Sequence, residues 1–92
     1  MSRNITAIRQ AGGDKHEHIV HLWWAERETG RQGNGTLADV VKFIEGGGRA
    51  YVDDGRGNVA NVGVYDTPGK PKWVQTYADG VWTDNLLALP RR

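Results

Sequence analysis

Alternating apolar and polar residues predict that β-strands make up most of this chain. Five segments are predicted as strands: residues 3–10, 16–26, 49–53, 58–65 and 72–77. Such alternation is typical of strands with one buried side, because successive side chains point to opposite faces. The segment 16–26 is apolar on both faces at its centre, which predicts a strand inside the sheet. Stretches rich in glycine and other turn formers at 11–14, 29–35, 54–57 and 66–69 predict turns and loops.

One segment has helical rather than alternating periodicity. Its apolar residues follow i, i+3, i+4, i+7 spacing and share one face: Leu37, Val40, Val41 and Ile44. Thr36 and Asp39 have the spacing of an N-cap and the acidic residue of a capping box. Glycines 46–48 then end the helix, because glycine readily adopts the left-handed conformation of a C-cap. The prediction is a helix of about ten residues that depends on the sheet for its stability.

The predicted element order is β-β-α-β-β-β, in one domain that spans residues 1–92. Short turns favour antiparallel pairing, and a single helix covers one face of the sheet. The expected fold is therefore α+β, with two layers and a mainly antiparallel sheet of about four or five strands. Residues 81–82 are expected to pair briefly, and residues 83–85 to cap a last turn that directs three leucines inward: Leu86, Leu87 and Leu89.

The composition excludes some kinds of chemistry. The chain has no cysteine, which rules out disulfide bonds, thiolate zinc sites and cysteine catalysis. Its 12 basic and 11 acidic residues give a net charge of +1, whereas a general nucleic-acid binder usually shows a basic excess. No segment is apolar enough for a signal peptide or a membrane span. We expect a cytoplasmic protein that does not contact membranes.

Three histidines lie within residues 16–21. If residues 16–26 form a strand, His16 and His18 point to one side and His21 points to the other. Two such imidazoles can bind zinc when a third ligand comes from another segment, but the sequence indicates no clear third ligand. We therefore favour the alternative, in which both histidines hydrogen-bond or stack at the end of a strand.

Residues typical of catalytic sites are few. The only serine is Ser2, and nucleophilic catalysis needs a base and an orienting group beside the nucleophile. Carboxylates do occur in pairs, such as Asp53 with Asp54, but an acid before a glycine is typical of a turn. Asp84 and Asn85 are interpreted as caps of the last turn. We expect neither enzymatic activity nor a cofactor.

The C-terminal sequence TDNLLALP, residues 83–90, resembles the ending of a family of small bacterial and phage proteins, a domain of unknown function. The resemblance extends to TAIRQ near the N-terminus, to HEHI from residue 16, and to AYVDD and GNV within residues 50–59. It covers nearly the whole chain. The family brings no established activity, so the resemblance implies a bacterial or phage origin and leaves the function open.

Four tryptophans and three tyrosines are many for 92 residues. A single helix leaves one sheet face uncovered, and an exposed aromatic face is typical of an interface. The expected function is non-catalytic binding of a protein partner or of a second copy, as a homo-oligomer. The candidate contact residues are Trp23, Trp24, Tyr51, Arg56, Trp73, Tyr77 and Trp82. Two alternatives are a binder of a small anionic or nucleotide-like ligand, with Arg56 as its loop cation, and a single-stranded nucleic-acid binder.

Overall fold

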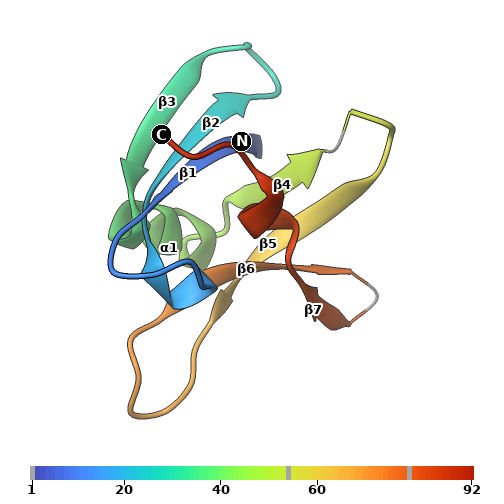
Figure 1. The fold of residues 1–92 in the computed structure, drawn as a ribbon. Coiled ribbons are helices and arrows are strands. Elements are labelled where there is room, and N and C mark those ends of the chain that lie inside the picture. The colour runs from blue at the N-terminus through green and yellow to red at the C-terminus, as the bar shows by residue number, and fades with distance from the viewer. Residues whose placement is uncertain (1, 54, 79) are drawn as a thin grey trace.

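The structure is a computed structural model that describes residues 2–53, 55–78 and 80–92. Strands, one α-helix and two short 3-10 helices follow one another along these residues (Figure 1). In chain order the elements are β1 (Ser2–Gln10), η1 (His16–His18), β2 (Ile19–Glu26), β3 (Gln32–Thr36), α1 (Leu37–Glu45), β4 (Arg49–Asp53), β5 (Val59–Tyr65), β6 (Trp73–Ala78), β7 (Val81–Thr83) and η2 (Asn85–Ala88). The fold class is α+β, as predicted.

The seven strands form one sheet in the order β3-β2-β1-β4-β5-β6-β7. Strands that follow one another through hairpins pair antiparallel, as short connections require. β1 and β4 are the exception and pair in parallel, because β2, β3 and α1 intervene between them along the chain. The helix lies against one side of this sheet (Figure 1), where it contacts β2, β3, β4, β5 and β6.

The helix forms where the capping pattern predicts it. The Thr36 hydroxyl accepts a hydrogen bond from the Asp39 backbone N–H at 3.3 Å, and the Asp39 carboxylate accepts one from the Thr36 N–H at 3.0 Å. These two bonds satisfy N–H groups that have no partner inside the helix. Gly46 is the C-cap, and Gly47 follows with a φ of +98°, a conformation that favours glycine. Both predicted ends of the helix are confirmed.

The core lies between α1 and the sheet. Its most deeply buried residues come from strands, helix and last turn: Ile5, Ile8, Ile19, Leu22, Val40, Val74 and Leu86. On the helix, Val40 and Val41 are buried while Leu37 and Ile44 pack at the edge of the core, which confirms the predicted apolar face. The 3-10 helices η1 and η2 also contact β6 and so extend the cover of the core.

The sheet has more strands than the sequence predicts. Residues 32–35 were expected in a loop, but they belong to β3, an edge strand with no apolar residue. The brief pairing expected at residues 81–82 is a three-residue strand, β7, which forms the other edge. The strand predicted to begin at residue 16 begins instead at Ile19, because residues 16–18 form η1.

The leucines of the last turn point inward as predicted, but the hydrogen bond at its start is made with strand β6 and not with the side chain of a predicted capping residue. Leu86 is completely buried, and Leu87 and Leu89 pack against the core. The side chain of Asp84, at the N-cap of η2, makes no capping hydrogen bond. The Asn85 N–H instead donates to the Thr76 hydroxyl of β6 at 3.2 Å. The prediction that residues 83–85 cap this turn through their own side chains is therefore wrong.

Beyond η2 the chain runs beside β1, at positions where β4 no longer pairs with it. Ile8 forms a parallel bridge with Arg91. The Ile8 N–H donates to the Pro90 carbonyl oxygen at 3.1 Å, and the Arg92 N–H donates to the Ile8 carbonyl oxygen at 3.0 Å. These bonds bring Arg92 to the sheet, although 83 positions separate it from its neighbour Arg9 along the chain.

Candidate functional site

The two faces of the sheet differ in what covers them. The helix face is identified by Arg3, whose guanidinium lies 3.7 Å from the centre of the Phe43 ring of α1. Strand register then assigns the other residues, because paired residues share a face and adjacent ones alternate. Trp24 lies on the helix face, opposite Ile5 of β1, and Trp23 lies on the opposite side. We call that opposite side the outer face.

Four aromatic rings gather on the outer face across β5, β6 and β7. They are Tyr65, Trp73, Tyr77 and Trp82, and we call them the ring cluster. Tyr65 and Trp73 stack nearly parallel, with centroids 4.5 Å apart and planes 8° apart. Trp82 meets Tyr65 and Tyr77 edge-on, at 5.1 and 5.5 Å. Stacked and edge-on pairs at such separations each contribute about 0.5–1.5 kcal/mol beyond their buried area.

Strand register and a glycine make the ring cluster possible. Tyr65 is paired with Trp73, and Tyr77 with Trp82, so each pair starts from opposite positions on neighbouring strands. Gly63 lies between them on β5, where an added Cβ would lie 3.1 Å from the Tyr77 ring. The Trp73 indole N–H donates to Gln75 at 3.1 Å, which fixes that ring further. The rings therefore have a defined arrangement before any partner binds.

The ring cluster is only partly covered. Tyr77 is 40% exposed and Trp82 is 41% exposed, whereas Trp73 and Tyr65 are half-buried. Large rings with this exposure can bury considerable apolar area against a partner, and Trp and Tyr are the residues that most often dominate binding energy at interfaces. This arrangement is suited to contact with another macromolecule.

A second group of residues surrounds Trp23 on the outer face of β1, β2 and β3. The guanidinium groups of Arg9 and Arg92 lie 5.2 and 4.9 Å from the centre of the Trp23 ring. The His21 ring lies 4.7 Å from it and shares a hydrogen bond of 2.9 Å with Asn34 of β3. Unlike the ring cluster, this group combines one indole with cationic and amide groups.

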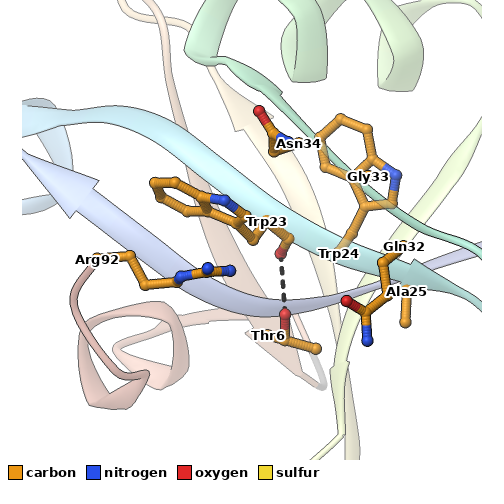
Figure 2. Close-up of a pocket in the computed structure, with 8 residues that line it drawn as sticks. All are labelled: Thr6, Trp23, Trp24, Ala25, Gln32, Gly33, Asn34 and Arg92. Atoms are coloured by element: carbon orange, nitrogen blue, oxygen red, sulfur yellow. Dashed lines mark hydrogen bonds between the residues drawn. The ribbon is translucent and has the colours of Figure 1, made fainter.

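A cavity of about 420 Å³ lies beside Trp23, and Figure 2 shows the residues that line it. Its lining residues are Thr6, Trp23, Trp24, Ala25, Gln32, Gly33, Asn34 and Arg92. Thr6 sits at a β-bulge of β1 and donates its hydroxyl hydrogen to the Trp23 carbonyl oxygen at 3.4 Å. Bulges often redirect a side chain next to a functional site. We call this space the Trp23 cavity. It cannot be predicted from the sequence, because its lining comes from segments far apart in the chain.

The predicted contact residues are thus only partly brought together. Trp73, Tyr77 and Trp82 belong to the ring cluster, and Trp23 lines the separate cavity. Trp24 and Tyr51 are buried, at 8% and 5% exposed, so the expectation that they present surface to a partner is wrong. Arg56 lies exposed in the loop between β4 and β5 and is not part of either group.

His16 and His18 belong to η1 and not to a strand, so the expectation that they point to the same side of a strand is wrong. The His18 ring packs over Gly13, and its Nδ1 accepts a hydrogen bond from the Lys15 N–H at 3.1 Å. His16 is buried, and its Nε2 has no hydrogen-bond partner among the described residues. Burial lowers the pKa of His16 despite the opposing effect of Asp84. Within residues 2–53, 55–78 and 80–92, no three His, Asp or Glu side chains come together as metal ligands would.

Comparison with known proteins gives a family and no activity. Among the described residues, no helix is long and apolar enough to cross a membrane, and α1 has only nine residues. No curated protein and no solved structure matches the chain. The model of one family, described as a protein of unknown function (DUF3892), matches residues 4–90. The chain therefore belongs to the DUF3892 family.

Proposed function

We propose that this protein is a non-catalytic binding module that docks onto proteins through the ring cluster, with a second copy of itself as the first partner. The observation that carries the proposal is the exposure of Tyr77 and Trp82 within four interlocked rings, on the sheet face that α1 leaves uncovered. Rings fixed in advance lose little conformational freedom on binding, so more of their buried area contributes to affinity.

The competing explanation is that the rings only shield the outer face of a small sheet from water. Tyr65 and Trp73 are consistent with that role, because they stack on each other and are half-buried. Tyr77 and Trp82 are not explained by it, since each keeps about 40% of its surface exposed. The two exposed rings are therefore the positions at which a binding role is tested.

Sedimentation velocity over a range of protein concentrations tests self-association. The test variant is Trp82→Ser, and the matched control is Val81→Ser, because Val81 is 63% exposed on the same strand and points to the opposite side. We expect the wild type to dimerise, Trp82→Ser to weaken dimerisation about tenfold or more, and Val81→Ser to leave it unchanged. Circular dichroism confirms that each variant is folded.

A wild type that remains monomeric up to about 0.5 mM, a concentration far above the Kd of specific interfaces, contradicts self-association. Equal weakening by Trp82→Ser and Val81→Ser contradicts the role of the ring cluster. Binding of a different protein through the same rings is measured separately, by site-specific photo-cross-linking.

We also infer a bacterial or phage origin from the sequence resemblance, and a cytoplasmic location, with which the lack of cysteine is consistent. For a phage protein, the partner of the ring cluster would be a host protein. Fractionation of the cells that produce the protein tests the location, and recovery with the membrane or periplasmic fraction would contradict it.

A further inference from the structure

The Trp23 cavity is a second candidate site, and it differs from the ring cluster in charge and chemistry. Among the residues that the structure describes, Arg92 is the one charged side chain that lines it, and the Arg9 guanidinium lies on the same indole. Among the described residues, no Asp or Glu side chain lines the cavity or forms an ion pair with either arginine. Two guanidinium groups on one indole offer charged N–H donors to an anion.

The Arg92 guanidinium is held in place before any ligand arrives. The Arg92 backbone N–H donates a hydrogen bond to Ile8, and the main-chain oxygen of Arg92 accepts one of 2.8 Å from Arg9 Nε. Its side chain lies over the Trp23 ring, as Figure 2 shows. A guanidinium stacked on an indole keeps its N–H groups at the edge of its plane available for a bidentate bond to an oxyanion.

The rest of the lining offers neutral hydrogen-bonding groups. Gln32 and Asn34 lie two residues apart on β3, so their amides point to the same side. The Gln32 amide presents both a donor and an acceptor. The Asn34 Oδ1 is bonded to His21, which leaves the Asn34 N–H groups as donors. The Thr6 hydroxyl, which donates to the Trp23 carbonyl, keeps its oxygen as an acceptor. The volume of about 420 Å³ falls within the range of small-molecule sites, about 300–1,000 Å³.

We infer that the Trp23 cavity binds a small phosphorylated or carboxylated molecule, with its oxyanion on Arg92 and its polar body on Gln32 and Asn34. A nucleoside monophosphate has this combination of an oxyanion and hydrogen-bonding edges, and amide side chains recognise such edges well. The site is separate from the ring cluster and does not depend on the function proposed for it. Failure of one proposal leaves the other unaffected.

Titrations followed by NMR and by calorimetry test this inference on the whole chain. The probes are the four nucleoside monophosphates, ribose 5-phosphate, inorganic phosphate and benzoate. Benzoate tests whether a carboxylate is bound as well as a phosphate. Inorganic phosphate and ribose 5-phosphate test how much of the affinity comes from the phosphate group alone and how much from the rest of the molecule. We expect at least one probe to shift the amide signals of residues 23, 32 and 34 and the Trp23 indole signal. A single charge-assisted contact contributes about 1.5–3 kcal/mol, so Arg92→Gln should weaken binding about tenfold or more.

The matched control is Arg31→Gln, which removes the same charge from the β2–β3 connection, outside the cavity. Gln32→Ala should reduce the preference for a nucleoside monophosphate over inorganic phosphate, because it removes an amide that contacts the body and not the anion. The inference is overturned if no probe binds at about 5 mM, because even a weak site with a Kd of about 1 mM would be mostly occupied at that concentration. It is also overturned if Arg92→Gln binds as tightly as Arg31→Gln.

Discussion

Two glycines of β3 determine how Trp24 is buried. Gly33 and Gly35 alternate with polar residues, so both glycines lie on the helix face, where Trp24 packs against their backbone. An added Cβ at Gly33 would lie 2.8 Å from Trp24 Nε1, and one at Gly35 would lie 3.1 Å from the same ring. The absence of side chains at these two positions is therefore a packing requirement.

We predict that Gly33→Ala lowers the free energy of unfolding by about 1–3 kcal/mol, because the methyl group overpacks a well-filled contact. Urea denaturation measures the change. Gln32→Ala is the control, since Gln32 is exposed on the same strand and points to the outer face. Equal stability of Gly33→Ala and the wild type would show that the Trp24 ring moves without loss.

His16 should make stability depend on pH. Its pKa in the folded protein lies below the ordinary value of 6.5, chiefly because burial disfavours the imidazolium. Below pH 6.5 the unfolded chain binds a proton that the folded protein takes up only at lower pH. The contribution of His16 to stability is therefore complete above about pH 6.5 and is lost as the pH falls through the folded pKa.

The variant His16→Gln removes this titration. We expect urea denaturation between pH 7 and pH 5 to show a smaller loss of stability in the variant than in the wild type. If the free energy of unfolding falls equally with pH in the two proteins, other groups cause the acid sensitivity. Protonation of the buried imidazole would then not be destabilising.

At the scale of elements, the helix depends on its N-terminal hydrogen bonds because it has only nine residues. Thr36→Ala removes the hydroxyl that accepts from the Asp39 N–H. We predict a loss of about 1 kcal/mol in the free energy of unfolding, the usual effect of removing an N-cap. Lys42→Ala, an exposed change on the same helix, should have a smaller effect, and denaturation curves of the two variants give the comparison.

The same hydrogen bonds explain the ionisation of Asp39. Its pKa is lowered chiefly by the hydrogen bond from the Thr36 backbone N–H. The folded protein thus favours the carboxylate, and this contribution to stability is present above the pKa of the unfolded chain and is lost as the pH falls through the lower folded pKa. This loss begins below the ordinary Asp pKa of 3.8, whereas the loss at His16 begins below 6.5, so acid should affect the His16 region before it weakens the cap.

The sequence predicted the helix well because its signals are local. Thr36, Asp39 and the spacing of four apolar residues lie within one short segment. β3 was missed because its sequence, QGNGT, has no apolar residue, and its glycines are explained only by a tryptophan on another strand. η1 was missed because the alternation of residues 16–18 is the same as that of a strand, whereas the close packing of His18 on Gly13 is not visible in the sequence.

At the scale of the whole molecule, the sequence predicted that one helix leaves an aromatic sheet face uncovered. It could not say which rings lie there, because that depends on register: Tyr65 opposite Trp73 and Tyr77 opposite Trp82. It also could not place Arg92 over Trp23, since this contact needs the chain beyond η2 to run beside β1. Long-range pairing therefore determines both candidate sites.

The whole-molecule architecture separates stability from binding. The apolar core is on the helix face, whereas the ring cluster and the Trp23 cavity are both on the outer face, at opposite ends of the strand order. Changes on the outer face should therefore alter binding more than they alter folding. This separation allows the two sites to be tested independently in one folded protein.

Site-specific photo-cross-linking tests the central claim most directly. A benzophenone-bearing amino acid replaces Trp82 in one variant and the exposed Lys42 of α1 in the other, and both are irradiated in the cells that produce the protein. The account predicts a cross-linked product of defined mass, either a dimer or a complex with another protein, at position 82 and not at position 42. No product at position 82, or the same products at both positions, would contradict the claim that the ring cluster is a protein-binding surface.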